Sequence, residues 1–561
     1  MGKLKAADNR NVKNTKAVTN FMGGVSYVPN SLEKLRLIAN SSIFGEPSYY
    51  RPSVIKNTKF LNTYDIFYAI DSKEAKFNTT EDIFEKAIDA ALDSDFKATL
   101  EFAVDLRLNM NMRLNPSVII VRALMHTKRA SFNEKNPIFM SECIKKIMMR
   151  PDDITNQFEY YMLISNSNKK GLPSMIKRSW AKYLGSMSAF HLNKYKNEGK
   201  LIDMVRISHA KSDLINELMK TGSVTVSDSE KTWNNFKSEG KSWKEILQLT
   251  YVPHMALLRN LRNIFGEISD RKIAKDVLKQ LVKGVAKSKQ FPFRYYSAYK
   301  AINKSDVHNK VLVLEYLNKC MEEAIDNQPK LKGKTISLCD NSGSAWGTFT
   351  AGKGSDANVM DGTSIATIGN LSGIMTAKNS KEGYVGVFGD KLEIMPVTKS
   401  SSVFDKLKEV ETAGRNIGMG TENGIWLFFK KAIKDKEHWD NIFIYSDMQA
   451  GHGSLFGVLK EEPLYAKYKK NVKSRRYIDV VALVEAYRKE VNPFVNIITV
   501  QTGGYDNTLI PENLYRGAIL SGWTGKEVMF AYEMDKTWTD IEKRSEGKSK
   551  KEESFILKPI K

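Results

Sequence analysis

Two different patterns of hydrophobic and polar positions divide the chain. From about residue 21 to residue 330, apolar residues recur every three or four positions, which is the spacing of amphipathic helices. The clearest segments of this kind span residues 80–92, 116–126, 180–195, 242–249 and 272–286. Glycines and prolines separate them, and strand-like alternation is scarce. We therefore predict a long succession of helices, of the kind that stacks in pairs as a helical repeat.

The pattern changes near residue 330. Short apolar runs lie at residues 335–339, 383–388, 391–397, 442–445 and 494–500, and helical segments lie at residues 364–377, 403–411, 424–433 and 480–490. Strands that alternate with helices indicate an open, mostly parallel α/β sheet, here with one hairpin around Gly389 and Asp390. Ligands of such sheets bind beyond the carboxyl ends of the strands.

These patterns predict four parts. They are a basic arm at residues 1–20, an all-α helical-repeat domain at 21–330, an α/β domain at 331–540 and a charged tail at 541–561. No stretch approaches the roughly 20 apolar residues of a membrane helix, and the first residues lack the apolar core of a signal peptide. The three cysteines are widely spaced, which disfavours a disulfide framework or a zinc site. We expect a cytoplasmic protein.

Positive charge is concentrated in the first part of the chain. The formal net charge is +22, of which residues 1–330 carry +18 and residues 331–561 carry +4. Nucleic acid is a common partner of such an imbalance, because each phosphate that Lys or Arg neutralises releases a counterion. The alternative is a basic surface that only keeps the protein in solution.

The sharpest local signal directly follows the first predicted strand. Asp340, Ser342 and Ser344 stand at alternate positions and direct small oxygen ligands to one spot, which suits a hard divalent cation such as Mg²⁺ or Mn²⁺. Thr421 begins a helix after a glycine-rich turn, and Asp447 ends a later strand. In a parallel sheet, both would lie on the same rim as Asp340. The alternative is an ordinary strand-to-helix turn, because such turns are rich in Asp, Ser and Gly.

These five residues resemble the metal-ion-dependent adhesion site of von Willebrand factor A domains. The resemblance implies that Ser342, Ser344 and Thr421 contact the metal directly, while the aspartates bind directly or through water. It also implies an open coordination position for an acidic group of a partner. The sequence departs from this family after Ser344, where Ala345 and Trp346 replace a frequent methionine.

Two phrases in the helical part are the most specific ones, residues 255–261 (MALLRNL) and 205–209 (VRISH). With looser likeness over most of residues 20–540, the chain resembles the TROVE domain family of the Ro autoantigen and its bacterial relatives. The resemblance implies a ring of HEAT-like repeats closed by the A domain. It also implies that small non-coding RNA of the Y type binds on the outer surface and that single-stranded 3′ ends enter the central hole.

The basic residues of the helical part are suited to RNA. We expect RNA contacts from Lys177, Arg178, Lys182, Lys196, Arg206, His209, Lys211, Arg259 and Arg262. Interleaved aromatic residues such as Trp180 and Tyr195 either stack on unpaired bases or pack in the core, and packing is the stronger hypothesis. His209 either contacts a phosphate or caps a helix. Arg259 and Arg262 project together, either into a ring lumen or into ion pairs with a neighbouring repeat.

No arrangement of catalytic residues is recognisable. The seven histidines include no HExxH, no P-loop occurs, and Cys143 and Cys339 lie in apolar runs. We therefore predict a non-catalytic RNA-binding protein. Its predicted partners are small non-coding RNAs, Y-like or misfolded, and an RNA-processing protein, but neither DNA nor a membrane. The alternatives are a metal-dependent protein-binding scaffold, for instance a virion or assembly component, and a metal-dependent nuclease.

Overall fold

The computed structural model describes residues 17–19, 25–27, 30–41, 80–109, 112–165, 171–196, 201–225, 231–288, 290, 292–346, 364–418, 422–446, 480–502, 508–511, 514–521 and 527–547. The described residues fall into two compact units. The helical unit comprises Ser31–Phe60 and Asn78–Val252, and the α/β unit comprises Met1–Asn30, Leu61–Phe77 and Pro253–Lys561.

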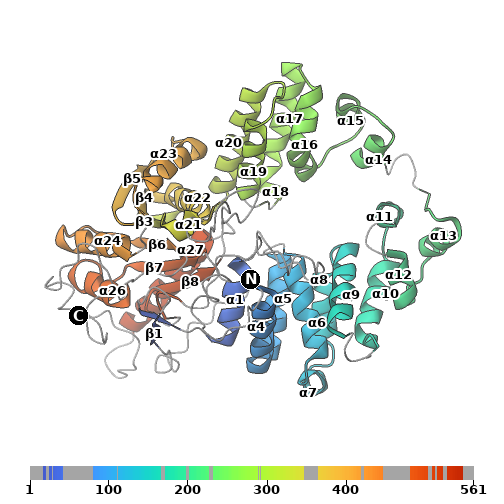
Figure 1. The fold of residues 1–561 in the computed structure, drawn as a ribbon, viewed down its shortest axis with the longest axis horizontal. Coiled ribbons are helices and arrows are strands. Elements are labelled where there is room, and N and C mark those ends of the chain that lie inside the picture. Colours follow the sequence, from blue (N-terminus) through green and yellow to red (C-terminus); the bar gives the residue numbers. More distant parts are fainter. Residues whose placement is uncertain are drawn as a thin grey trace. The chain divides into compact units, whose positions relative to one another are not determined.

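The helical unit is built from helices alone in its described residues (Figure 1). They are α1 (Ser31–Ser41), α4 (Thr80–Ser94), α5 (Phe96–Leu108), α6 (Leu114–Met125), α7 (Arg129–Lys135), α8 (Phe139–Ile147), α9 (Pro151–Ser165), α10 (Ser174–Gly185), α11 (Ala189–Tyr195), α12 (Leu201–Ser208), α13 (Asp213–Thr221), α14 (Trp233–Ser238) and α15 (Trp243–Leu249). α5 packs against α6 and α8, α6 packs against α9, and α10 packs against α8 and α12. This arrangement agrees with the predicted stack of helical pairs.

The segment predicted as one helix at residues 180–195 is interrupted. α10 ends at Gly185, and α11 begins after Ser188, whose hydroxyl accepts a hydrogen bond from the backbone N–H of His191. Serine is a preferred residue at this capping position, because its side chain satisfies a backbone N–H that has no partner within the helix. The predicted helix at residues 272–286 is likewise divided, at Gly284. Apolar spacing continues across both breaks, so periodicity alone does not reveal them.

The α/β unit contains helices and a sheet. Its helices are α16 (His254–Glu267), α17 (Arg271–Lys283), α18 (Val285–Ser288), α19 (Pro292–Asn303), α20 (Lys310–Asp326), α21 (Gly343–Trp346), α22 (Ile365–Lys378), α23 (Val403–Arg415), α24 (Glu422–Lys434), α26 (Val480–Glu490) and α27 (Glu527–Gly547). Its strands are β1 (Ala17–Thr19), β2 (Val25–Tyr27), β3 (Leu331–Asp340), β4 (Ser380–Phe388), β5 (Leu392–Val397), β6 (Asn441–Ser446), β7 (Asn496–Gln501) and β8 (Gly517–Ser521).

Six of these strands form one sheet in the order β5-β4-β3-β6-β7-β8. Neighbouring strands are parallel except β4 and β5, which form an antiparallel hairpin. The predicted open, mostly parallel sheet and its hairpin near Gly389 are therefore confirmed. The direction of strand progression reverses between β3 and β6, and ligands of such sheets bind at the carboxyl ends of the strands at this point.

Helices cover both faces of this sheet (Figure 1). α24 and α26 pack on the face that carries Ile336 and Leu338, in a core of fully buried apolar side chains. α22 packs on the opposite face, where the hydroxyl groups of Thr376 and Tyr445 lie 2.7 Å apart. Gly373 allows α22 to lie close to the sheet, since a Cβ atom at this position would be 2.5 Å from the Cys339 sulfur. The carboxyl end of β3 is thus held between two helical layers.

The helices that precede the sheet belong to the same compact unit. The Ser402 hydroxyl in front of α23 donates a hydrogen bond of 3.1 Å to Asn318 of α20. Glu322 of α20 forms an ion pair of 2.6 Å with Lys378 of α22. The change of sequence pattern near residue 330 therefore differs from the division between the two compact units, which lies after Val252.

Four elements lie outside the predicted pattern. β1 pairs with β2 in antiparallel register at the edge of the predicted arm, β8 adds a strand at one edge of the sheet, and α27 continues to Gly547 within the predicted tail. Strands of three to five residues are too short to show a clear period. Among the helices that the structure describes, none has the length and apolar character needed to cross a bilayer.

Candidate metal site and cationic surfaces

Asp340 ends β3 at the rim of the sheet, and its carboxylate is buried. One carboxylate oxygen accepts a hydrogen bond of 3.0 Å from the backbone N–H of Ser342, and the other accepts a bond of 2.7 Å from the Ser446 hydroxyl. Ser446 ends β6, the parallel neighbour of β3. The strand register therefore brings together oxygen atoms from two strands at the point where the strand order reverses.

A pair of amide side chains holds the turn after Asp340. Asn341 and Asn370 exchange two hydrogen bonds of 2.9 Å each, and both residues are buried. A Cβ atom at Gly414 would lie 2.1 Å from the Asn341 side-chain oxygen, so the glycine leaves room for this pair. The pair fixes the backbone that carries Ser342 at the sheet rim.

The structure brings together two of the five residues predicted as metal ligands, Asp340 and Ser342. Ser344 lies in α21, but its side chain is outside the described residues, as are Thr421 and Asp447. The neighbouring elements follow the prediction, since α24 begins at Glu422 and β6 ends at Ser446. Sequence reasoning missed Ser446 as a partner of Asp340. Its position as the last residue of an apolar run, directly before Asp447, is the signal that could have identified it.

The donor atoms in this part of the site suit a hard cation. Asp340, Ser342 and Ser446 offer oxygen atoms only, which Mg²⁺ prefers in proteins. Across the described part of the chain, no group of three or more His, Cys, Asp and Glu side chains could hold a metal ion, and Asp340 is the one carboxylate among these three residues.

Trp346, where the sequence departs from the adhesion-site pattern, carries a cation on its ring. The guanidinium carbon of Arg415 lies 4.0 Å from the centre of the half-buried indole, and Arg415 itself is exposed. A cation over the face of a Trp ring is favourable by about 1 kcal/mol at such sites. Arg415 directly follows Gly414, which contacts Asn341, so a positive charge stands near the candidate metal site.

Four predicted RNA-binding residues form what we call the helical-unit cationic surface, Arg178, Lys182, Arg206 and Lys211. Arg178 and Lys182 are one turn apart on α10, and Arg206 lies on α12, which packs against α10. A Cβ atom at Gly185 would lie 3.0 Å from the Lys211 carbonyl oxygen, so Lys211 lies at the carboxyl end of α10. All four are exposed, and Arg178, Arg206 and Lys211 form no ion pair with any acid that the structure describes.

His209 has a conformational role at the end of α12. Its backbone is left-handed, with a φ of 57°, and its N–H donates to the Arg206 carbonyl at 3.3 Å. The N–H of Ala210 donates to the Val205 carbonyl at 3.1 Å. These two bonds satisfy the last carbonyls of the helix in a Schellman motif. His209 therefore caps the helix through its backbone, while its exposed side chain lies three residues after Arg206 in sequence.

The remaining predicted residues lie apart from this surface. Lys177 is half-buried, and the Lys196 ammonium donates a 3.0 Å hydrogen bond to the Gly222 carbonyl at the end of α13. Arg259 and Arg262 are exposed on α16, in the α/β unit, and form no ion pair with a described acid. Of the predicted aromatic residues, Trp180 is fully buried and donates to Gln157 at 2.8 Å.

A group of cations around Tyr195 was not predicted. Arg150 donates a 2.8 Å hydrogen bond to the Tyr195 hydroxyl, and the Lys194 ammonium lies 5.4 Å from the ring centre. His191 stacks on the same ring at 6.5 Å. Burial, with Lys194 and Arg150 nearby, lowers the pKa of His191. The four-residue spacing of His191 and Tyr195 on one helix is the signal that could have identified this group.

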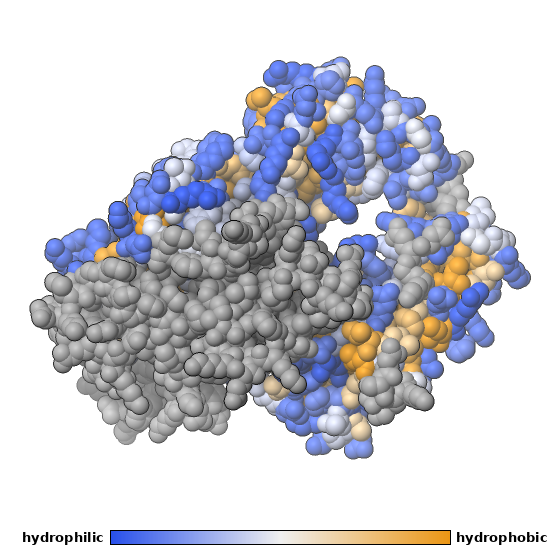
Figure 2. Space-filling model, in the orientation of Figure 1, coloured by the Kyte–Doolittle hydropathy of each residue, from blue (hydrophilic) through white to orange (hydrophobic). Residues whose placement is uncertain are grey.

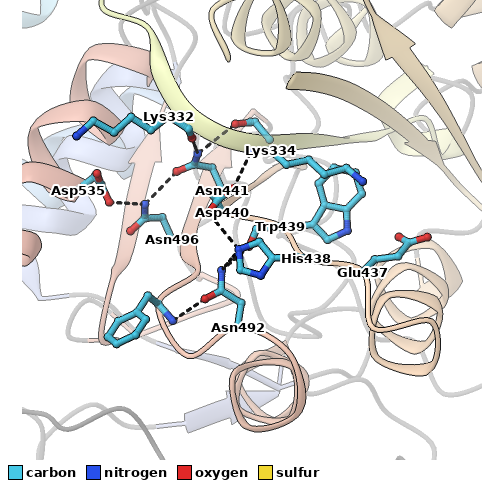
Figure 3. Close-up of polar contacts among 12 residues, drawn as sticks. Lys332, Lys334, Glu437, His438, Trp439, Asp440, Asn441, Asn492, Asn496 and Asp535 are labelled. Atoms are coloured by element: carbon cyan, nitrogen blue, oxygen red, sulfur yellow. Dashed lines mark hydrogen bonds and ion pairs between the residues drawn. The ribbon is translucent and has the colours of Figure 1, made fainter. Parts of the chain in front are cut away.

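A polar network lies at the amino ends of β6 and β7, at the end of the sheet opposite to Asp340 (Figure 3). Asn496 donates to Asn441 at 2.9 Å, and the His438 ring contacts Asp440 at 3.2 Å and Asn492 at 3.3 Å. In the described residues, no hydroxyl or thiol group contacts His438, so this His–Asp pair has no nucleophile to activate. The network joins neighbouring strands and supports the fold.

Two comparisons with known proteins bear on the family and the fold. The TROVE domain family model matches residues 228–336. The crystal structure of the Deinococcus radiodurans Ro (RSR) protein has a similar fold, with a TM-score of 0.52 and 12% sequence identity over 86% of this chain and 99% of that chain. No curated protein matches the chain in sequence.

These findings bear on two of the sequence-based predictions. The predicted fold class, a helical-repeat part followed by an α/β part of the von Willebrand factor A type, is confirmed. The predicted resemblance to the Ro/TROVE family is likewise confirmed, by a matching TROVE segment and by the fold of a Ro protein.

Proposed function

We propose that the chain is a non-catalytic RNA-binding protein of the Ro/TROVE type. It binds small structured non-coding RNA, Y-like or misfolded, on cationic surfaces of its helical repeats. Single-stranded 3′ ends enter the central hole of the ring that the resemblance implies. The protein acts in the cytoplasm together with an RNA-processing protein and carries Mg²⁺ or Mn²⁺ at its adhesion site. The TROVE match and the Ro-like fold support this proposal.

The helical-unit cationic surface is the observation that carries the proposal. Arg178, Arg206 and Lys211 are exposed, and none of them is neutralised by an acid among the described residues. An unpaired cation at the surface keeps its full attraction for phosphate, whereas a paired one must first break its ion pair. Such a surface therefore favours a polyanion, and it reads backbone charge and not base identity.

The salt dependence of RNA binding tests the proposal. The probe is a fluorescent RNA hairpin with a single-stranded 3′ tail, and fluorescence anisotropy gives its affinity between 50 and 300 mM salt. In the triple variant Arg178→Gln, Arg206→Gln and Lys211→Gln, we expect the slope of log affinity against log salt to become shallower by about 2, since each lost phosphate contact removes about 0.7 to 0.9.

A matched control removes three charges that are already paired in the same unit. The variant Arg113→Gln, Lys128→Gln and Lys145→Gln changes the net charge equally, but these residues pair with Asp152, Asp93 and Glu142. The control should bind RNA with nearly the wild-type slope. Equal losses in both variants would contradict a specific surface, and a wild-type affinity that is independent of salt would contradict RNA binding by charge.

A metal-dependent protein-binding scaffold is the second candidate function. The oxygen set of Asp340, Ser342 and Ser446 at the sheet rim favours it, because an adhesion site of this kind holds an acidic group of a partner through its metal. The variant Asp340→Asn preserves the size of the side chain and removes its charge. It should spare RNA affinity if the chain is an RNA-binding protein, and it should abolish Mg²⁺-dependent capture of a partner protein if the chain is a scaffold.

A further inference from the structure

Helix α17 has two opposite faces. Ala274, Val277, Leu278 and Leu281 are buried against neighbouring helices, chiefly α20 and α16. The lysine face, as we call the other side, consists of Lys272, Lys275, Lys279 and Lys283, all of them exposed. At 100° per residue, these four positions fall within an arc of about 80°, roughly opposite the buried side chains. The surface of this part of the chain is largely hydrophilic (Figure 2).

The lysine face is a regular line of charge. With a rise of 1.5 Å per residue, successive lysines are separated along the helix axis by about 4.5, 6 and 6 Å. The line therefore extends over about 16 Å. A nucleic acid strand offers a similarly regular line of negative charges, whereas the acidic residues of a folded protein surface are irregularly placed.

None of these four lysines forms an ion pair with an acid in the described part of the chain. Other exposed lysines of the same unit do. Lys319 pairs with Glu315, Lys330 with Asp326, Lys408 with Asp405 and Lys431 with Asp435, each three or four residues away in sequence. The lysine face thus keeps its charges, whereas ion pairs neutralise these four other lysines of the unit. Asp276 is the one acidic residue of α17 and pairs with none of the four lysines.

The chemistry of the face favours RNA over a protein partner. Stable protein interfaces are centred on buried aromatic or aliphatic anchors. No large hydrophobic residue of α17 is exposed. Lysine ammonium groups act as mobile point charges, which suit phosphates. The lysine face therefore offers positive charge but no exposed apolar anchor for a protein partner.

We propose that the lysine face of α17 contacts successive phosphates of one RNA strand, a second contact line in addition to the helical-unit cationic surface. This inference rests on the proposed RNA-binding function. Because only the backbone is read, the contribution is independent of RNA sequence. This contribution to affinity decreases as salt rises, because it comes from the release of counterions.

The test is a quadruple variant in the full-length protein, Lys272→Gln, Lys275→Gln, Lys279→Gln and Lys283→Gln. Glutamine is a good helix former, so α17 is retained. The matched control is Lys319→Gln, Lys330→Gln, Lys408→Gln and Lys431→Gln, which removes four paired charges from the same unit. Anisotropy titrations use the tailed RNA hairpin and a second hairpin of unrelated sequence. We expect the quadruple variant to flatten the salt slope by about 3 for both hairpins, and the control to leave it within about 1 of the wild type.

Three results would overturn the inference. One is a wild-type slope in the quadruple variant, and another is an equal loss in the control, which would assign the effect to net charge. The third is displacement of RNA from the wild type by poly-glutamate at equal charge concentration, which would assign the face to acidic proteins. Single variants at Lys275 and Lys279 each flatten the slope by about 0.7 to 0.9, which keeps the test decisive if the quadruple variant misfolds. Absence of RNA binding by the wild-type protein refutes the proposed function itself.

Discussion

The buried ion pair between Arg107 and Asp153 gives the sharpest test of what stabilises the helical unit. The guanidinium of Arg107 lies 2.8 Å from the Asp153 carboxylate, and the two side chains are 3% and 1% exposed. Arg107 also donates to the Ile147 carbonyl at 3.1 Å. The carboxylate accepts the backbone N–H groups of Met149 and Arg150 at 3.0 and 2.9 Å. The pair therefore joins α5 to the first turn of α9 and to the turn that precedes it.

The expected loss of stability follows from the cost of removing these charges from water. Burial raises the pKa of Asp153 although Arg107 stands beside it, so the cost of removing the carboxylate from water exceeds the attraction of the pair. Removing one partner then leaves an uncompensated charge in the core, at a cost of about 3 to 5 kcal/mol. Arg107→Met and Asp153→Asn should each destabilise the unit by about 3 kcal/mol. The double variant removes both charges and keeps the backbone contacts to residue 153, so it should cost about as much as one single change, with a coupling of about 3 kcal/mol.

Hydrogen exchange measured by mass spectrometry on peptides of α5 and α9 is the assay, because it reports local opening in a protein of two units. A cost of about 3 kcal/mol raises the exchange rate roughly 100-fold. The control is Arg113→Met. Arg113 forms an ion pair with Asp152 at the surface, where the two side chains are 44% and 31% exposed. An exposed pair is worth less than about 1 kcal/mol. Equal exchange in Arg107→Met and Arg113→Met, or strict additivity in the double variant, would refute the reasoning.

Three further predictions concern pH, backbone strain and close packing. His254 contacts the Leu281 carbonyl at 2.9 Å and the Tyr295 hydroxyl at 3.0 Å, and burial lowers its pKa. Because the native state then binds fewer protons than the unfolded state, the thermal midpoint should fall as pH drops below about 6.5. The variant His254→Gln should remove this part of the pH dependence. His209→Gly should stabilise α12 by about 1 kcal/mol in hydrogen exchange, because glycine adopts a φ of 57° without strain, and RNA affinity should fall in the same variant only if the imidazole contacts phosphate. Gly383→Ala should destabilise the α/β unit by about 3 kcal/mol in thermal melting, because its Cβ would lie 2.0 Å from the Ala377 carbonyl oxygen. The control Gly266→Ala on α16, where a Cβ atom would have no neighbour within 4 Å, should stabilise the unit by up to about 1 kcal/mol.

Local pattern was sufficient for the type and order of most elements. Many of the helices, five of the six sheet strands and the hairpin at Gly389 follow from the periods of apolar residues, because a helix or strand that buries one face must repeat its own geometry in sequence. The buried state of Cys143 and Cys339 followed from the same apolar runs. Of the two TROVE-like phrases, the one at residues 255–261 lies inside the segment that the TROVE family model matches, and such short phrases carry information that composition lacks.

Tertiary structure alone decided which distant residues meet. The partnership of Asp340 with Ser446 depends on the pairing of β3 with β6, which are separated by about a hundred residues and which no local period connects. The same holds for Arg107 with Asp153 and for the cations around Tyr195. The spacing of the four lysines of the α17 lysine face is present in the sequence. Its exposure became known only when the packing of α16 and α20 covered the opposite side, because burial is a property of contacts between elements and not of any one element.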